Sequence, residues 1–387
     1  MNNKPRLLII NQSPVSYFKD IIFDLRELNE VSLMCGDIDN YFPNDIKYIF
    51  SKTYNRNSLI NRSYSWFLFF LHAFYYLLFN NYKYEKVLIV SNPPFVIWLS
   101  LICPKKVRIL LFDIYPNILE QISSNNIAVN LILRLIIFLW KSLNFFIYKS
   151  IIKIFTISNK MAEKIYYSSI LNPNLKDKIV VVYPWSNIFS DKDKDKDKIF
   201  KFRKNFLHDS RLLIIYSGNM GLTHPLEFLV NSSSKIKDYA KVVLIGKGAK
   251  RKKLEAITKK ISINQTLFLD PFPFEEISLC ISCADLCVVC IDGPSSQYSL
   301  PSKLFTALNC GKPILAIAPN NSELSNIVKK YKCGFVIPPN NLFEKEFCLL
   351  IKDLYQSPDK LKIFSNNAKK ASKLFSKENS LNLIRNL

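Results

Sequence analysis

The sequence has very little glycine, and nearly all of it lies in one part of the chain. Only 8 of the 387 residues are glycine, and seven of these eight fall between Gly218 and Gly334. Glycine is needed where a backbone must turn sharply or approach a ligand closely. A chain that avoids glycine elsewhere therefore points to residues 218–334 as the region that holds a site.

Motifs that would identify a function directly are also missing. The chain has no Gly-x-Gly-x-x-Gly sequence and no Walker phosphate loop. No Asp-x-Asp cluster presents itself as a metal site, and the aspartates of residues 191–197 alternate with lysine in an expected loop. The apolar run at residues 7–10 has only the length of a strand, so we expect no secretory signal.

The cysteines indicate neither disulfides nor a metal site. Their number, nine, is odd, and several lie inside apolar runs, which favours reduced, buried thiols in a cytosolic protein. The four cysteines of residues 280–290 form two Cys-x-x-Cys pairs, one at the end of an expected helix and one in an expected strand. Because residues i and i+3 of a strand point to opposite faces, four ligands would not converge, and we expect small core residues instead.

Acidic residues are outnumbered by basic ones, 31 against 53, which gives a net charge of +22. Such an excess indicates an anionic partner: nucleic acid, anionic lipid or a phosphorylated ligand. Much of the excess is lysine beside asparagine and isoleucine, a composition that an AT-rich genome also produces. The net charge is therefore weaker evidence for an anionic partner than it would otherwise be. The apolar fraction of 49% allows full cores, and 387 residues are enough for two domains.

Apolar strands and helices alternate along the chain, which predicts parallel α/β sheets. The expected strands are residues 6–11, 31–35, 86–90, 107–112, 155–158, 179–183, 211–216, 242–245, 268–270, 286–291, 314–318 and 335–337. The Asp-Lys alternation of residues 191–198 has no apolar face, and we expect an exposed connection there. We predict an N-terminal domain over residues 1–198, a C-terminal domain over 199–370, and a helix over 371–387 that could pack back on the first domain.

Two apolar segments of the first half resemble membrane-binding helices. Residues 66–79 fall short of the roughly 20 residues that span a bilayer, so they form a buried helix or one that dips into a membrane surface. Residues 130–155 contain four basic residues, Arg134, Lys141, Lys149 and Lys153. On a helix these four lie within roughly a third of the circumference. The pattern is typical of a helix on an anionic membrane surface, or of a core helix whose solvated side is basic.

The most informative stretch is a polar loop followed by a helix, at residues 292–313. Pro301 suits the start of this helix, Ser299 or Ser302 can cap it, and a Gly-Lys-Pro sequence ends it. Lys303 lies one turn inside. A helix N-terminus beside a lysine is a site for an anion, unless this is an ordinary capped surface helix.

Other strand ends carry residues that bind ligands in α/β proteins. Gly218 and Gly221 follow one expected strand, and a Gly-Lys-Gly sequence at 246–248 follows the next, so both loops could approach a phosphate. In the first half, Asp113 follows the strand at 107–112. Ligands bind at this edge of an open parallel sheet, although Asp113 could equally cap a turn.

Taken in order, these landmarks resemble the C-terminal domain of a family 4 retaining glycosyltransferase of the GT-B fold. They are Tyr-Ser-Gly-Asn-Met-Gly at 216–221 with His224, Gly-Lys-Gly at 246–248, Ala-Asp at 284–285, Pro-Ser-Lys-Leu-Phe at 301–305 and Gly-Lys-Pro-Ile-Leu-Ala at 311–316. The sequences at 113–116, 156–158 and 183–187 resemble landmarks of a subgroup that adds sugars to bacterial O-antigen and capsule repeat units. The resemblance covers most of the chain and implies two Rossmann-like domains that face each other across a cleft.

The resemblance also implies roles for individual residues. Gly218 and Asn219 would lie over the diphosphate of a nucleotide sugar, and Ser302 and Lys303 would meet the same diphosphate. His224 stands where relatives often have a lysine that contacts the phosphates. Negative charge develops on the leaving diphosphate, so cations at His224 and Lys303 would lower the barrier without a metal.

Further residues would bind the nucleotide or the acceptor. The resemblance implies that Lys247, Arg251 and Phe272 flank the nucleotide. Many relatives have two glutamates in place of Tyr298 and Thr306, and the second binds the ribose; Thr306 offers a hydroxyl but no charge. Asp113 would orient or deprotonate the acceptor hydroxyl.

We therefore expect a cytoplasmic enzyme, peripheral on the inner face of the plasma membrane, without a metal or other cofactor. It would transfer a sugar, with retention, from a nucleoside-diphosphate sugar such as a UDP-sugar to a polyprenyl-diphosphate-linked saccharide in surface polysaccharide synthesis. Its partners would be that acceptor and the anionic membrane surface, not nucleic acid. Two alternatives stand: a nucleotide-sugar epimerase of the same fold, which needs no acceptor, and a non-enzymatic nucleic-acid-binding protein. The second alternative predicts basic residues interleaved with aromatic ones along one surface, whereas lysine here is spread over loops and helices.

Overall fold

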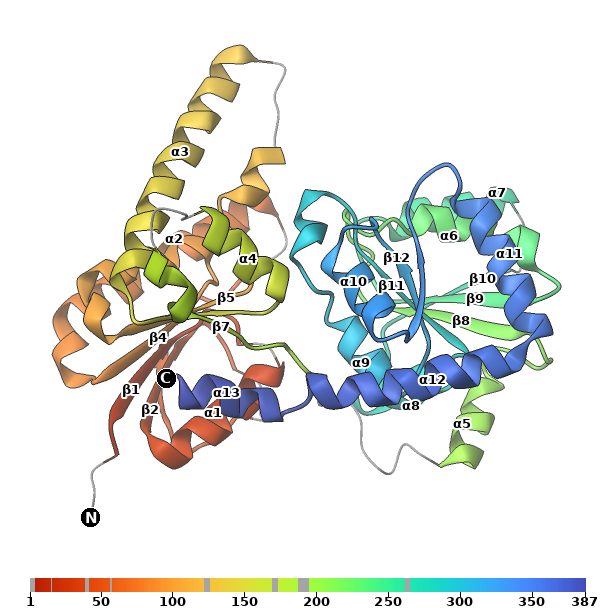
Figure 1. Cartoon of the computed structure of the whole chain (residues 1–387), viewed down its shortest axis with the longest axis horizontal. Coiled ribbons are helices and arrows are strands. Elements are labelled where there is room, and N and C mark those ends of the chain that lie inside the picture. The colour runs from red at the N-terminus through yellow and green to blue at the C-terminus, as the bar shows by residue number, and fades with distance from the viewer. Residues whose placement is uncertain are drawn as a thin grey trace. The chain divides into compact units, whose positions relative to one another are not determined.

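The strands of the chain form two separate sheets, and every strand pair that the structure describes is parallel. The computed structural model describes residues 4–14, 16–38, 42–55, 58–121, 126–168, 173–186, 195–261 and 265–387. The chain divides into unit 1, Met1–Tyr183 with Lys377–Leu387, and unit 2, Pro184–Ser376. Each unit is a Rossmann-like sheet with helices along it (Figure 1), which confirms the expected fold class.

Unit 1 contains a seven-stranded sheet in the order β3-β2-β1-β4-β5-β6-β7. Its strands are β1 (Arg6–Ile10), β2 (Glu30–Cys35), β3 (Lys47–Phe50), β4 (Lys86–Val90), β5 (Val107–Leu111), β6 (Lys153–Thr156) and β7 (Ile179–Val181). In β1 and β4 the last four residues are fully buried. Continuous apolar runs are what a parallel strand covered on both faces requires.

The helices of unit 1 differ widely in how far they are buried. They are α1 (Ser16–Leu28), α2 (Leu59–Asn80), α3 (Ile127–Ser150), α4 (Asn159–Ser168) and α13 (Glu378–Arg385), with 3-10 helices η1 (Asn81–Lys83), η2 (Pro94–Ile102), η3 (Pro104–Lys106), η4 (Asn117–Gln121) and η5 (Pro173–Lys178). In α2 the residues Phe69, Ala73 and Leu77 are buried at a spacing of one turn, and α2 packs on η2. The apolar segment at 66–79 thus has one core face, while its Phe67 and Phe79 are exposed.

Helix α3 presents its apolar surface mainly to solvent. Figure 1 shows it extending beyond the rest of unit 1, and its buried residues, Asn144, Ile147 and Tyr148, lie in the last two turns. Among the described residues, α3 is the one helix long and apolar enough to cross a membrane, and only 22% of its most apolar stretch is buried. A core helix would bury that stretch, so α3 does not fit the alternative of a core helix with a basic solvated side.

Unit 2 contains a six-stranded sheet in the order β10-β9-β8-β11-β12-β13. Its strands are β8 (Leu212–Ser217), β9 (Ala240–Ile245), β10 (Thr266–Leu269), β11 (Leu286–Cys290), β12 (Ile314–Ile317) and β13 (Gly334–Ile337). Its helices are α5 (Lys196–Arg203), α6 (Leu226–Ser232), α7 (Arg251–Ile261), α8 (Phe274–Ser282), α9 (Lys303–Asn309), α10 (Glu323–Lys330), α11 (Phe343–Gln356) and α12 (Pro358–Ser372), with 3-10 helices η7 (Ser233–Ile236), η8 (Pro294–Gln297) and η9 (Lys373–Phe375). One face of the sheet packs on α6 and α11 through Leu229, Phe343 and Phe347, which are fully buried.

The Asp-Lys alternation falls partly outside the described residues, which resume at Asp195. The Asp195 carboxylate caps α5 by accepting hydrogen bonds from the backbone N–H groups of Asp197 and Lys198. The residues from 195 to 198 are exposed, as expected, but 196–198 are helical. An aspartate at the N-cap explains this, because it satisfies N–H groups that the first turn leaves unpaired.

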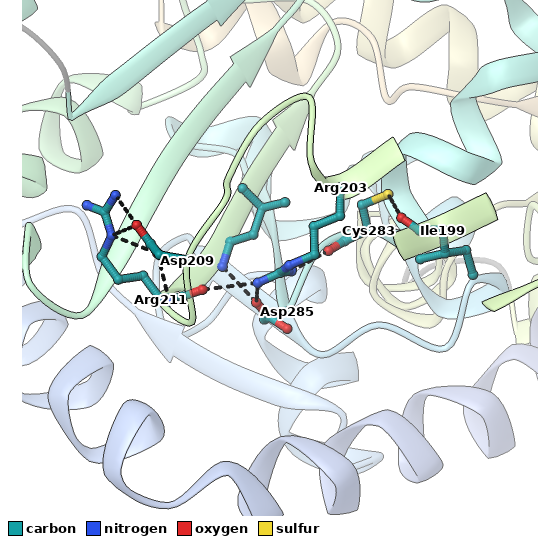
Figure 2. Close-up of polar contacts among 7 residues, drawn as sticks. Ile199, Arg203, Asp209, Arg211, Cys283 and Asp285 are labelled. Carbon is teal, nitrogen blue, oxygen red and sulfur yellow. Dashed lines mark hydrogen bonds and ion pairs between the residues drawn. The ribbon is translucent and has the colours of Figure 1, made fainter. Parts of the chain in front are cut away.

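Asp285, in the Ala-Asp landmark, connects three segments at the amino end of the unit 2 sheet (Figure 2). Its carboxylate accepts a hydrogen bond from the backbone N–H of Leu213, at 2.7 Å, and one from the Arg203 guanidinium, at 2.8 Å. Arg203 also donates to the carbonyl groups of Cys283 and Arg211, at 2.7 and 3.0 Å. This landmark therefore holds α5 against the starts of β8 and β11, and lies at the sheet edge opposite to the loops described below.

The last helix belongs to unit 1 although unit 2 precedes it in the chain. Helix α13 packs on α1, and its Ser380 hydroxyl donates a hydrogen bond to the Asp24 carboxylate. Lys377 forms an ion pair with the same carboxylate at 3.2 Å. Unit 1 is thus assembled from two segments of the chain that are far apart in sequence.

Candidate functional site

Three loops of unit 2 come together where β8, β9 and β11 end. The backbone N–H of Gly218, after β8, donates to the Ile245 carbonyl at 2.8 Å, and that of Met220 donates to the Lys247 carbonyl at 2.7 Å. The loop after β11 leads into α9, whose Lys303 reaches Gly218. In parallel sheets, ligands bind outside the carboxyl ends of the strands. The structure therefore brings the glycine loops and Lys303 together at this edge.

Glycine is required in these loops both for conformation and for space. Gly218, Gly246 and Gly248 all have φ values near +140°, a region that other residues rarely adopt. A Cβ atom on Gly246 would lie 2.0 Å from the carbonyl oxygen of Gly218, and one on Gly248 would lie 2.6 Å from the backbone nitrogen of Met220. The first two loops thus contact each other backbone to backbone, which explains why glycine is concentrated here.

Lys303 is the central cation of this group. Its side chain is partly buried, and its ammonium lies 5.5 Å from the centre of the Tyr216 ring. Burial lowers the pKa of Lys303 below its usual value. Within the part of the chain that the structure describes, no carboxylate forms an ion pair with it. Even partial burial of a cation without a counter-ion destabilises the folded chain, and an anionic ligand bound to Lys303 would offset that destabilisation.

The N-terminus of α9 contributes less than the sequence suggested. The helix has only seven residues, and its N-cap residue Ser302 makes no side-chain capping hydrogen bond. The backbone N–H groups of Leu304 and Phe305 already donate to the carbonyl groups of Pro301 and Ser302. The Lys303 side chain, rather than a row of open N–H groups, is therefore the main attraction for an anion.

His224 lies in the same group but is not the cation expected from the sequence. Burial, together with the positive charges of Lys303 and Lys250, lowers its pKa to about 4. Its Nδ1 accepts a hydrogen bond from the backbone N–H of Gly221 at 3.0 Å, so the proton of the neutral ring lies on Nε2. His224 can therefore donate a hydrogen bond to an anion but supplies no charge near pH 7.

Sequence reasoning missed an ion pair beside His224. The Lys250 ammonium donates to the His224 carbonyl at 2.9 Å and to the Glu227 carboxylate at 3.0 Å, and both side chains are largely buried. This pair fixes the loop that holds His224. The one available signal was that Lys250 follows the Gly-Lys-Gly sequence, but its partner on α6 could be found only in the fold.

Lys247 and Arg251, which were expected to flank the nucleotide, differ in their exposure and in their partners. Lys247 is exposed between two glycines. The Arg251 guanidinium donates to the Gly246 carbonyl at 2.8 Å and forms ion pairs with Glu255 and Asp270, at 2.9 and 2.5 Å. Arg251 therefore stabilises the loops after β9 and β10, and its contact with a nucleotide stays a prediction.

Phe272 and Thr306 both have protein partners. The Phe272 ring packs against the rings of Phe202 and Phe206, with centroids 5.5 and 6.2 Å apart. The Thr306 hydroxyl lies 3.1 Å from that of Ser186, and Asn309 donates to the Ser186 carbonyl at 2.6 Å. Ser186, from the expected landmark at 183–187, is thus tied to α9; Asn187 lies outside the described residues.

Asp113 belongs to unit 1, where it follows β5 and is exposed at the carboxyl edge of the sheet. Tyr115 lies beside it: burial and then the negative charge of Asp113 raise the pKa of Tyr115 to about 12. The expected position at a sheet edge is therefore what the structure shows. The role of Asp113 toward an acceptor stays a prediction.

The described residues contain no group of three or more histidine, cysteine or acidic side chains arranged to hold a metal ion. The four cysteines of residues 280–290 are all buried. Burial raises the pKa of Cys287, so this thiol stays protonated. These side chains behave as small core residues.

Comparison with known proteins agrees with the geometry of unit 2. Residues 197–371 match the sequence family described as "Glycosyl transferases group 1". Two curated relatives are WbjE of Pseudomonas aeruginosa, a glycosyltransferase by name, at 23% identity over 33% of this chain, and WcaI of Escherichia coli strain K12, a colanic acid biosynthesis glycosyl transferase by name, at 22% identity over 46% of this chain. The matched segments cover 32% and 43% of the lengths of these two proteins. The match of residues 197–371 thus falls in the part of the chain where the sequence resembles a glycosyltransferase.

Solved structures show the same fold over nearly the whole chain. The crystal structure of Anabaena Alr3699/HepE in complex with UDP aligns with a TM-score of 0.70 at 14% identity, over 98% of both chains. The same protein in complex with UDP-glucose aligns with a TM-score of 0.67 at 15% identity, again over 98% of both. At this level of identity the likeness concerns the fold, which is GT-B.

Proposed function

We propose that this chain is a retaining glycosyltransferase that uses a nucleoside-diphosphate sugar, most simply a UDP-sugar, as its donor. The match of residues 197–371 to the family described as "Glycosyl transferases group 1" supports the enzyme class. The UDP and UDP-glucose complexes of a protein with the same fold support the donor. The acceptor would be a polyprenyl-diphosphate-linked saccharide in surface polysaccharide synthesis. The name of WcaI, which refers to colanic acid biosynthesis, favours such a pathway.

One observation carries the proposal. The Lys303 ammonium is partly buried beside two glycine loops, and no carboxylate among the described residues forms an ion pair with it. A diphosphate would supply the missing negative charge. Its charge grows as the sugar leaves, so a fixed cation stabilises the transition state more than the bound substrate. Because the sugar–phosphate bond breaks at that moment, Lys303 would contribute to the rate as well as to donor affinity.

The other residues of the site would support the same step. The Nε2–H of neutral His224 would donate a hydrogen bond to a phosphate oxygen, and Gly218 and Asn219 would let the backbone come close to the diphosphate. Retaining transfer of this class does not depend on a carboxylate nucleophile, so no acidic residue is needed beside Lys303. Asp113 of unit 1 would accept the proton of the acceptor hydroxyl or orient it.

A membrane-bound acceptor would also account for α3. Its exposed apolar residues and its basic residues suit a helix that lies on an anionic membrane surface. The enzyme would then work at the inner face of the plasma membrane, where both the nucleotide sugar and the lipid-linked acceptor are within reach.

The first test is a thermal-shift series with UDP, GDP, ADP and dTDP on the wild-type protein, Lys303→Ala and Lys312→Ala. Lys312 is a matched control because it follows the opposite end of α9. A ligand that binds only the folded state stabilises it by about 2.7 kcal/mol at 100 times its Kd. We expect UDP to give the largest shift, Lys303→Ala to reduce it, and Lys312→Ala to leave it unchanged. Absence of any shift with the folded wild-type protein would contradict the proposal.

A second assay separates the alternatives. With a UDP-sugar and no acceptor, an epimerase would interconvert two sugars, whereas a transferase would leave the nucleotide sugar largely intact. A nucleic-acid-binding protein would bind generic DNA in a salt-dependent way that Lys303→Ala does not change. Transfer of the sugar to a lipid-linked saccharide, lost in Lys303→Ala, would support the transferase.

A further inference from the structure

Two pockets of unit 1 share one lysine of α3. The first, of about 440 Å³, is lined by Arg134, Phe138 and Lys141 of α3 and by Glu120 of η4. The second, of about 300 Å³, is lined by Lys141 again, together with Tyr115 and Lys164. Lys141 therefore lies between a pocket that follows α3 outward and a pocket that reaches the loop after β5.

Both pockets are positively charged on balance. Arg134 and Lys141 are two helical turns apart and so lie on the same face of α3. Lys141 forms an ion pair with Glu120, whereas the residues that the structure describes offer Arg134 no ion-pair partner. Lys164 adds a third cation at the inner pocket. The single carboxylate of Glu120 leaves an excess of positive charge for an anion with more than one negative charge.

An exposed apolar surface begins next to this basic stripe. Its members on α3 are Leu131, Ile132, Leu135, Phe138 and Leu139, with exposed fractions of 57–65%. At about 100° per residue, this surface covers roughly the third of the helix that borders the stripe of Arg134 and Lys141. Phe138 belongs to both, since it lines the first pocket and is 65% exposed. The pockets, the basic stripe and the exposed apolar residues together form one surface, with positive charge in the pockets and apolar side chains beside them.

We propose that this surface binds an isoprenoid diphosphate, with its diphosphate at Lys141, Arg134 and Lys164 and its apolar chain along the exposed face of α3. The inference rests on the proposed function, since such a molecule is the lipid part of the acceptor. Tyr115 lines the inner pocket, two residues after Asp113, and the Asn144 amide donates to the Tyr115 carbonyl at 2.8 Å. A saccharide attached to the diphosphate therefore extends toward the loop that carries Asp113.

The connections of α3 place it on the membrane surface rather than across the membrane. The strands on either side of it in sequence, β5 and β6, are neighbours in the same sheet. If α3 spanned a bilayer, the segment between β5 and α3 would have to cross it as well. That segment contains Asp113, Asn117 and Glu120, and unpaired polar and charged groups are excluded from the hydrocarbon core. A helix at the interface leaves its basic stripe at the level of lipid phosphates.

Glu120 distinguishes this site from simple insertion of an apolar helix. The Glu120 carboxylate forms an ion pair with the Lys141 ammonium when no ligand is bound. A diphosphate that binds Lys141 must therefore displace this carboxylate. Removing the carboxylate therefore favours the diphosphate, but it does not change the apolar surface of α3. A neutral substitution at Glu120 should strengthen diphosphate binding and leave binding of an uncharged chain unaltered.

The test is calorimetric binding of farnesyl diphosphate, inorganic pyrophosphate and farnesol to the full chain, with UDP present in excess to occupy unit 2. We expect farnesyl diphosphate to bind more tightly than either of its halves. Lys141→Ala should weaken it by about tenfold or more, the usual size for loss of a charged hydrogen bond. Glu120→Gln should tighten it, and Lys149→Ala, on the same helix but outside both pockets, should leave it unchanged.

Three results would overturn the inference. They are equal binding of pyrophosphate and farnesyl diphosphate, no change in Lys141→Ala, and phosphatidylglycerol vesicles that compete fully for the site, which would make it a general anionic-lipid surface. The midpoint of thermal unfolding, measured on each variant, shows that the protein is folded. If UDP fails to bind the wild type while farnesyl diphosphate binds as described, the proposed donor fails and the lipid site stands.

Discussion

The Lys303 side chain fills the space that a side chain at Gly218 would need: a Cβ atom there would lie 2.0 Å from the Lys303 Cε. We predict that Gly218→Ala displaces the Lys303 ammonium from its place beside the Tyr216 ring. It also forces alanine into a backbone conformation with φ of 143°, which costs about 1–3 kcal/mol. UDP affinity, measured by calorimetry, should fall by about tenfold or more because the main cation of the site is moved.

A matched control for this variant is Gly311→Ala at the other end of α9. Gly311 also has a positive φ, of 64°, but the nearest atoms to its added Cβ belong to the flexible Lys369 side chain. This variant should lose stability and keep UDP affinity. Equal loss of affinity in both variants would mean that backbone strain, not the contact with Lys303, sets donor binding.

The low pKa of His224 predicts a specific pH dependence of stability. The pKa is about 4 in the folded chain, chiefly through burial, against about 6.5 in an unfolded chain. Between these values the unfolded state binds a proton that the folded state excludes, so the free energy of unfolding falls as the pH drops from about 6.5 to about 4. His224→Gln should make stability less dependent on pH in this range.

Urea unfolding at two pH values inside and above this window measures the effect. His208→Gln is the control because His208 is exposed. Both variants could show the same difference in the free energy of unfolding between the two pH values as the wild type. In that case His224 is not the group that titrates, and its assignment as a neutral donor loses its support.

The hydrogen bonds of Asp285 predict that a substitution at this residue lowers the stability of the protein but leaves its UDP affinity unchanged. Asp285→Ala leaves the Leu213 N–H and the Arg203 guanidinium without their shared acceptor. We expect the free energy of unfolding to fall by about 1–3 kcal/mol, the cost of unpaired buried polar groups. Asp209→Ala breaks the neighbouring but more exposed pair with Arg211, which should cost less than about 1 kcal/mol. A reduced UDP affinity in Asp285→Ala would show that this edge of the sheet does influence the site.

Asp113→Asn separates sugar transfer from donor binding. The amide keeps the size of the carboxylate but accepts a proton poorly, so transfer to an acceptor should fall by about 100-fold or more. UDP affinity should not change, because Asp113 lies in unit 1 and the residues proposed for the donor lie in unit 2. Transfer at the wild-type rate would remove the proposed role of Asp113.

The central strands could be predicted because strands that are buried on both faces have continuous apolar runs, as in β1, β4 and β8. Strand β3 was missed: it is four residues long and half-exposed at the edge of its sheet. Its Tyr-Ile-Phe run favours a strand, but three residues are too few to distinguish a short edge strand from apolar residues in a loop. The helix at α5 was missed for a related reason, because its first residues are all charged.

The site was predictable where geometry constrains residue type and not where it depends on distant contacts. Gly218, Gly246 and Gly248 were informative because no other residue fits their backbone. The pairing of Lys250 with Glu227 joins α6 to the loop after β9, and spacing along the chain does not encode it. The neutral state of His224 likewise depends on burial and on Lys303, neither of which the sequence displays.

The place of α13 has a consequence for how the protein is made. Unit 1 lacks its last helix until residues 377–387 have left the ribosome, since Ser380 and Lys377 must reach Asp24. Unit 2 is contiguous in sequence, and all of its residues precede that helix. A chain truncated before residue 377 would therefore carry an incomplete first unit, with its α1 surface exposed, beside a second unit that has all of its residues.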